Sequence, residues 1–170
     1  MKYYFIDFEA SALHKLSYPI EVGIACLDME DLSITSKSWL IRPTKLWIDQ
    51  WVWMPESAAI HNIPFETLLK NGHEPLEVVE QINEFVDSKT VYSDAHRYDG
   101  DWHMKLIDAA NVEASFIVDD MFTLLVNYNR EISFRVIRWI DEQPTIHRAE
   151  PDAIKLAESI QIAERLKNDL

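Results

Sequence analysis

Two carboxylates at the end of an apolar strand limit what this chain can fold into more than any other feature. Tyr3 to Phe8 is a run of aromatic and β-branched residues, typical of a strand buried on both faces. Asp7 lies inside this run and Glu9 follows it directly. Side chains two residues apart in a strand point the same way, with Cα atoms about 7 Å apart, so both acids converge on one side.

Two converging carboxylates need compensation if they are buried. An unpaired carboxylate in apolar surroundings costs several kcal/mol, and a divalent cation compensates two carboxylates at once. A strand end at which both side chains reach water would need no cation. The Asp-x-Glu pattern by itself leaves these two interpretations equally open.

Size and composition indicate one soluble globular domain over residues 1–170, with 48% apolar and 26% charged residues. Cys26 is the only cysteine, which excludes a disulfide framework and a cysteine-type zinc site. The chain shows no leader sequence and no apolar run of about 18 residues. We therefore expect a cytoplasmic protein that does not contact a membrane.

The formal net charge of −13 argues against non-specific binding to long duplex DNA, which requires a basic surface. It does not exclude an enzyme that acts on nucleic acid, because carboxylates gathered around metal ions would account for part of the excess. Most of the remaining acids are expected on solvated helix faces such as residues 74–87.

The order of predicted elements indicates a mixed α/β sheet. The first strand and the predicted strands 18–27 and 32–41 are joined by short turns, which favours a three-strand antiparallel meander. Two further strands, 90–93 and 115–118, alternate with helices and should extend the sheet in parallel, with helices on both faces and the first strand central. Helices are expected at 64–70, 75–86 (with Leu76, Val79 and Ile82 inward), 98–110, 121–126, 132–140 and 150–168.

A tryptophan-rich segment, Trp47 to Met54, holds Trp47, Trp51 and Trp53. Such a cluster could stack on bases, cover the core or form a dimer contact. Cover or contact is favoured, because no basic residue is interleaved after Lys45.

Three motifs in chain order resemble one known family. The first is Asp7-Phe8-Glu9, the second is Tyr98-Asp99-Gly100-Asp101-Trp102 at a helix start, and the third is the segment from His147 to Ala153, which contains Asp152. Together they resemble the DEDD superfamily of 3′–5′ exonucleases, in its histidine-containing (DEDDh) branch, and are similar to RNase T, oligoribonuclease and polymerase proofreading domains. The segment Ile60-His61-Asn62-Ile63 also resembles that family, so the likeness extends from about Tyr3 to Ile162.

The resemblance implies a ribonuclease H-like fold and a two-metal mechanism. It assigns Asp7, Glu9, Asp99 and Asp152 as ligands of two Mg²⁺ or Mn²⁺ ions and His147 as the general base, so that these five residues form the catalytic set. The terminal nucleotide is expected to meet Ala10, Ser11 and Leu13 of the turn after the first strand, and His61.

This sequence departs from the family pattern at two places. Ala10-Ser11-Ala12 stands where the family usually has Thr-Thr-Gly or Thr-Gly, which affects the expected contacts with the 3′ end. The family often has an asparagine before the second-motif aspartate, whereas this chain has Asp94 in that region. Asp94 is therefore a rival for the metal role of Asp99, and Asp101 is a third, weaker candidate. We prefer Asp99 because Tyr98 and Trp102 fix the register.

The resulting hypothesis is a metal-dependent 3′–5′ exonuclease. It would act on RNA or single-stranded DNA, or on a short oligonucleotide with a free 3′ end, and release nucleoside 5′-monophosphates. The sequence leaves two alternatives open, a non-catalytic nucleic-acid or protein-binding module on the same fold and a diesterase for dinucleotides. Family members are often dimers, so a homodimer is a further expectation. RNA or DNA preference, substrate length and pathway are not encoded in these motifs.

Overall fold

The structure is a computed structural model, and it describes residues 1–168. Its sheet has five strands in the order β3-β2-β1-β4-β5, so the acid-bearing first strand is central. β1 pairs antiparallel with β2, β2 pairs antiparallel with β3, and β4 and β5 continue the sheet in parallel. The mixed sheet predicted from the sequence is confirmed. The strands are β1 (Lys2–Ala10), β2 (Pro19–Asp28), β3 (Ile34–Leu40), β4 (Thr90–Ser93) and β5 (Ile117–Asp120).

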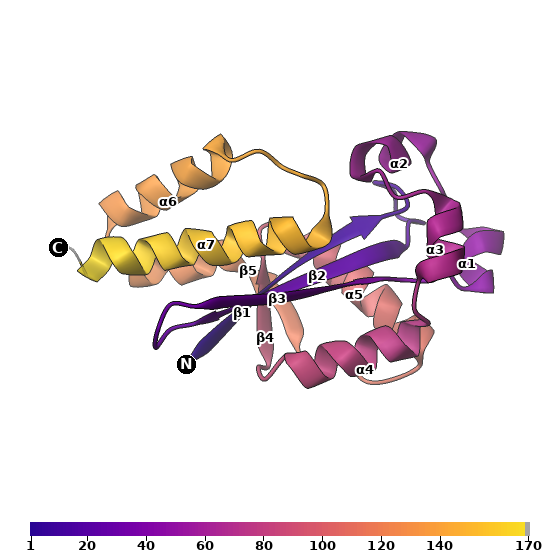
Figure 1. The fold of residues 1–170 in the computed structure, drawn as a ribbon, viewed down its shortest axis with the longest axis horizontal. Coiled ribbons are helices and arrows are strands. Elements are labelled where there is room, and N and C mark those ends of the chain that lie inside the picture. Colours follow the sequence, from indigo (N-terminus) through magenta and orange to yellow (C-terminus); the bar gives the residue numbers. More distant parts are fainter. Residues whose placement is uncertain (169–170) are drawn as a thin grey trace.

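Helices cover both faces of this sheet, as Figure 1 shows. α6 and α7 lie over one face, α4 and α5 lie over the other, and the short helices α1 to α3 gather beyond one end of the long strands (Figure 1). No helix within residues 1–168 is long and apolar enough to cross a membrane. The helices are α1 (Lys45–Gln50), α2 (Pro55–His61), α3 (Phe65–Asn71), α4 (Pro75–Phe85), α5 (His96–Ala110), the 3₁₀ helix η1 (Met121–Asn127), α6 (Arg130–Glu142) and α7 (Ala149–Asn168).

Alternation along β1 divides its side chains between two hydrophobic cores. Ile6 and Phe8 pack in the core that also contains α4 and α5 residues, whereas Phe5 packs in the core with α7 residues. Because side chains two apart share a face, Asp7 and Glu9 continue the Phe5 side of the strand. The two acids therefore emerge on the face that α7 covers.

The observed elements include the helices α1 and α2, which were not expected, and differ from the prediction in three further places. β5 begins at Ile117 rather than Ser115 and extends to Asp120, because Asp119 and Asp120 pair with the end of β4. Leu76 is 44% exposed rather than inward, since the buried stripe of α4 runs through Pro75, Val78, Val79 and Ile82. Residues 121–127 form a 3₁₀ helix rather than an α-helix.

The tryptophan-rich segment covers the core. Trp47 is buried and stacks on Tyr18 and Trp51, with ring centroids 5.4 Å and 5.9 Å apart. Trp53 packs edge-on against Phe65, with centroids 5.2 Å apart. These contacts within the chain favour the cover interpretation over a base-stacking platform.

Candidate active site

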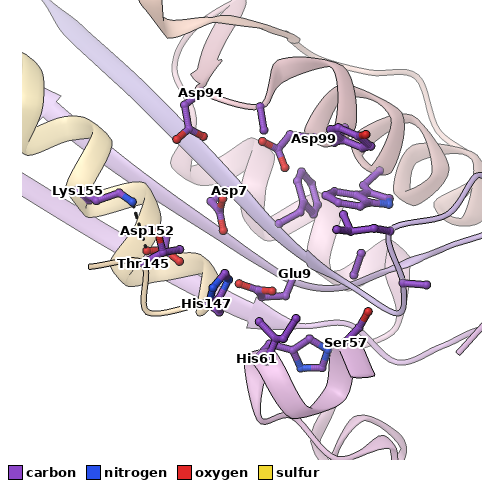
Figure 2. A pocket seen from close by; sticks show the side chains of 18 residues that line it. Asp7, Glu9, Ser57, His61, Asp94, Asp99, Thr145, His147, Asp152 and Lys155 are labelled. Atoms are coloured by element: carbon purple, nitrogen blue, oxygen red, sulfur yellow. Dashed lines mark ion pairs between the residues drawn. The ribbon is translucent and has the colours of Figure 1, made fainter. Parts of the chain in front are cut away.

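A cavity of about 300 Å³ opens where the end of β1 meets the first turn of α7 (Figure 2). Its wall is formed by acidic side chains and by apolar side chains. The carboxylates are Asp7, Glu9, Asp94, Asp99 and Asp152, and the apolar wall includes Ala12, Leu13, Ile60, Tyr98 and Trp102. The other polar residues of the lining are Ser57, His61, Thr145, His147 and Lys155.

The five carboxylates form two groups that share Asp7. Oxygens of Asp7, Glu9 and Asp152 lie within 4.8 Å of one another, and so do oxygens of Asp7, Asp94 and Asp99. Hard oxygen donors in this number are the ligands that Mg²⁺ and Mn²⁺ prefer. The geometry brings the four acids of the three sequence motifs to one place and adds Asp94 to them.

Burial, and then the crowding of acids, raises the pKa values of Asp7, Glu9 and Asp99 in the protein without bound cations. Burial, and then the neighbouring Asp99, Glu9 and Asp152, raise the pKa of Asp7 well above its usual range. Burial, followed by Asp152 and Glu21, raises the pKa of Glu9 to about 8, and burial raises that of Asp99 to about 7. The same low-dielectric surroundings that penalise the bare carboxylates would favour a bound divalent cation. The donor set thus fits two such ions.

Small residues on the sheet let α7 approach closely enough to bring Asp152 to Asp7. Gly23 is the β2 partner of Asp7, and a Cβ added there would lie 2.2 Å from the carbonyl carbon of Ala149. On β3, Ser36 and Ser38 donate hydrogen bonds to the Glu150 carboxylate, at 2.7 Å and 3.1 Å. The first turn of α7 is therefore seated directly on β2 and β3.

A buried glutamate fixes the segment that precedes α7. Glu21 on β2 accepts two hydrogen bonds from the Arg148 guanidinium, at 2.9 Å and 2.6 Å, and a third from the Ala149 amide at 3.1 Å. Glu21 pairs with Glu9 across the strands. The hydrogen bonds to Glu21 raise the pKa of Arg148, so its guanidinium is a permanent positive charge beside Glu9.

His147 is held between two anchored neighbours. Its φ of 56° is left-handed, a conformation that the surrounding structure must maintain for a residue with a side chain. On one side the Ile146 amide donates to Asp152 Oδ1 at 3.3 Å, and on the other Arg148 binds Glu21. The imidazole is exposed at the cavity and lies beside Glu9 (Figure 2). This position is accessible to a water molecule or a substrate.

The second motif supplies Asp99 from the first turn of α5, next to β4. Asp99 is buried, and Ser93 at the end of β4 donates a hydrogen bond to its carboxylate. Asp94 is exposed and reaches the same group of oxygens from the turn between β4 and α5. Asp101 points elsewhere, because it pairs with Lys105 at 2.7 Å and does not line the cavity.

The residues predicted to contact substrate are only partly brought together. Ala10, Leu13 and His61 line the cavity. Ser11 does not, because its buried hydroxyl donates to the Val52 carbonyl at 2.6 Å and accepts from the Tyr18 amide at 3.0 Å. His61 accepts a hydrogen bond from the Ile63 amide through Nδ1, which leaves its buried Nε2 without a partner among the described residues.

Sequence reasoning missed Glu21 and Lys155. Glu21 is an acid inside an otherwise apolar strand, the same signal that identified Asp7. Lys155 lies three residues after Asp152, a spacing that places two side chains on the same helix face. Both signals were present, but neither residue belongs to the recognised motifs.

Neither a family model nor a curated protein sequence matches this chain. Solved structures do. A zinc-bound complex of Escherichia coli exonuclease I with single-stranded DNA superposes with a TM-score of 0.71 over 98% of this chain, at 13% identity. Exonuclease I from Methylocaldum szegediense gives 0.71 over 98% at 15% identity, and cell-death related nuclease 4 (CRN-4) gives 0.70 over 98% at 13% identity.

These likenesses establish the fold. The aligned region spans 41% of the length of each exonuclease I chain and 64% of the length of the CRN-4 chain. The ribonuclease H-like architecture expected from the three motifs is thus confirmed.

Proposed function

We propose that this chain is a member of the DEDD superfamily, in its histidine-containing branch, and acts as a metal-dependent 3′–5′ exonuclease. The observation that carries the proposal is the convergence of three distant motifs in one cavity, where their acids form two groups that share Asp7. The fold shared with exonuclease I and CRN-4 supports it. The substrate class would be single-stranded DNA or RNA with a free 3′ end.

Each group of carboxylates would hold one Mg²⁺ or Mn²⁺ ion, with Asp7 contributing to both. Asp7, Glu9 and Asp152 form one ligand set, and Asp7 with Asp99, joined by Asp94, forms the other. Bound divalent ions supply Lewis-acid activation of water and stabilisation of the leaving oxygen.

Side chains of this protein would accept the proton of the attacking water and bind the terminal nucleoside. His147 would accept the proton of the attacking water on its imidazole, because a neutral imidazole has one ring nitrogen that can take up a proton. Attack at phosphorus forms a P–O bond and breaks the bond to the 3′ oxygen, which leaves as the new 3′ end after it takes up a proton. The released product is a nucleoside 5′-monophosphate. The apolar wall around Leu13, Ile60 and Tyr98 would hold the terminal nucleoside.

The test is the release of mononucleotides from a 3′-labelled oligonucleotide in Mg²⁺ or Mn²⁺. Wild-type protein should release labelled mononucleotide, and Asp7→Ala and His147→Ala should each abolish release while circular dichroism remains unchanged. Parallel DNA, RNA and dinucleotide substrates separate an exonuclease from a dinucleotide diesterase. Unchanged release by either variant, or oligonucleotide binding without degradation by wild type, would contradict the proposal.

A further inference from the structure

Lys155 is the one lysine or arginine among the residues that line the candidate active site. It lies one turn after Asp152 on α7, with its side chain 13% exposed, and its Nζ is 3.9 Å from Asp152 Oδ1. Figure 2 shows the lysine beside the carboxylates, with this ion pair drawn as a dashed line. Asp7, Glu9, Asp99 and Asp152 carry no positive charge, so they cannot themselves bind an anionic phosphate oxygen, whereas a lysine can.

The contact between Lys155 and Asp152 is an ion pair but not a hydrogen bond, because 3.9 Å exceeds the donor–acceptor distance of a hydrogen bond. An ammonium group carries three N–H donors. A lysine that is largely removed from water and is directed toward a cavity can therefore offer donors to an anionic oxygen that enters the cavity.

Lys155 also removes a net negative charge that would otherwise oppose an incoming phosphate. The cavity carries five carboxylates, which give −5 when all are ionised, and two divalent ions would contribute +4. Lys155 brings the total to zero, because −5 plus 4 plus 1 is 0. Without Lys155, the negatively charged phosphodiester would meet a site with a net negative charge.

The position of Lys155 indicates which part of a bound strand it meets. Figure 2 places it across the carboxylates from His61 and Ser57, and α2, which carries both, also supplies Ile60 to the apolar wall that would hold the terminal nucleoside. A strand with its 3′ nucleoside on that side and its remaining nucleotides across the carboxylates would run toward Lys155. Its next phosphate then lies on the side of Lys155.

We propose that Lys155 binds a phosphate of the bound strand, on the side of the carboxylates opposite to the terminal nucleoside. This inference rests on the proposed exonuclease function, and it adds a substrate-contacting residue outside the three motifs. Lys155 also acts on Asp94: burial raises the pKa of that carboxyl, and the charge of Lys155 opposes the rise. A role limited to balancing Asp94 is thus the competing explanation that an experiment must separate.

The experiment measures binding of a 5′-fluorescent single-stranded oligonucleotide by anisotropy, in Ca²⁺ and in a His147→Ala background that prevents cleavage. One oligonucleotide has phosphates throughout, and a second has an uncharged methylphosphonate at the linkage next to the scissile one. The variants are Lys155→Met, Lys155→Met with Asp94→Asn, and Lys167→Met. Lys167 is a matched control, because it lies on the same helix and pairs with Glu164 at the same i,i+3 spacing, at 3.7 Å.

Lys155→Met should weaken binding of the all-phosphate oligonucleotide about tenfold, as expected for loss of one charged hydrogen bond. It should not change binding of the methylphosphonate oligonucleotide, and Lys167→Met should change neither. Unchanged binding by Lys155→Met, or full recovery when Asp94→Asn is added, would overturn the phosphate contact. A parallel cleavage assay of the unsubstituted protein in Mg²⁺ separates the two failures. If that protein degrades neither oligonucleotide, the proposed function fails, whereas degradation together with binding that Lys155→Met leaves unchanged overturns only the phosphate contact.

Discussion

Glu21 and Arg148, separated by 127 positions, form a two-pronged ion pair at the point where the last helix meets the sheet. The Glu21 side chain is 3% exposed and that of Arg148 is 44% exposed. The two side chains therefore differ in how well water could replace the missing partner if the other were removed. Arg148 can turn to water, whereas Glu21 cannot.

This asymmetry predicts unequal effects of two substitutions. Arg148→Ala leaves a buried carboxylate without its partner and should lower the free energy of unfolding by about 3 kcal/mol. Glu21→Ala should cost less, about 1–2 kcal/mol, because it leaves only the Ala149 amide and a solvent-accessible guanidinium unpaired. Urea denaturation of both variants and of the double variant measures the coupling. Equal costs for the two single variants would contradict the asymmetry.

Gly23→Ala should disrupt the site without touching a carboxylate. The new Cβ would lie 2.2–2.4 Å from backbone atoms of Ala149 and Glu150, so α7 must move away from β2 and carry Asp152 from Asp7. We expect lower thermal stability and at least tenfold weaker Mn²⁺ binding by calorimetry, since one ligand of the shared set is displaced.

Gly100→Ala is the matched control for this prediction. A Cβ at Gly100, inside α5, would meet only Val118 Cβ at 4.0 Å. Alanine is about 1 kcal/mol more favourable than glycine within a helix, so this variant should be as stable as wild type or more stable. Mn²⁺ binding by Gly23→Ala at wild-type strength would show that the close approach of α7 is not required.

Stability without metal should fall as pH rises. Burial and neighbouring acids raise the pKa of Glu9 from 4.5 to about 8 and that of Asp99 from 3.8 to about 7. The folded protein then binds more protons than the unfolded chain across this interval, so the stability that these groups contribute is present at low pH and is lost toward pH 8. Thermal unfolding in EDTA from pH 5 to 8 measures the fall.

Two additions identify the source of this pH dependence. Mn²⁺ should raise the melting temperature most at pH 8, because the ion binds the deprotonated carboxylates. Glu9→Gln should flatten the profile measured in EDTA. A profile that rises between pH 5 and 8, or one that Glu9→Gln leaves unchanged, would contradict the pKa shifts.

Asp99 and Asp94 should differ in importance. Asp99 is buried and is oriented by the Ser93 hydroxyl, whereas Asp94 is exposed on a turn. Asp99→Asn should therefore reduce nuclease activity by at least a hundredfold and Asp94→Asn by about tenfold or less, as losses of a fixed and a peripheral ligand. Ser93→Ala should lie between them. Mononucleotide release by the three variants provides the comparison, and a larger loss for Asp94→Asn would reverse the assignment.

The strands of the sheet could be predicted from the sequence because the signals for them are local and strong. The apolar runs 3–8 and 18–27 and the short strand 90–93 each predicted a strand that the structure contains. The limits of β5 were missed because Asp119 and Asp120 are polar residues that take part in the sheet only through pairing with β4. Leu76 was misplaced because neighbouring positions on α4 offered two overlapping apolar stripes, and only packing selects one of them.

For the candidate site, motif order indicated which acids meet but not what brings them together. Nothing local to His147 reveals that Glu21, on a distant strand, anchors its neighbour Arg148. Likewise, Ser11 lies in the expected turn, but its hydroxyl is hydrogen-bonded to the backbone of Tyr18 and Val52 and does not face the cavity. The sequence does not reveal that these two residues lie beside Ser11. Long-range contacts of this kind depend on the assembled structure.

The central claim is that acids from three distant motifs hold two divalent ions through a shared Asp7. The most direct test is a crystal structure of the protein with Mn²⁺ and a nucleoside 5′-monophosphate, in which anomalous scattering locates the ions. We predict two peaks about 4 Å apart, with Asp7 bound to both, Glu9 and Asp152 to one, and Asp99 on the side of the other. Absence of ions from the cavity, or ions that do not contact Asp7, would contradict the account.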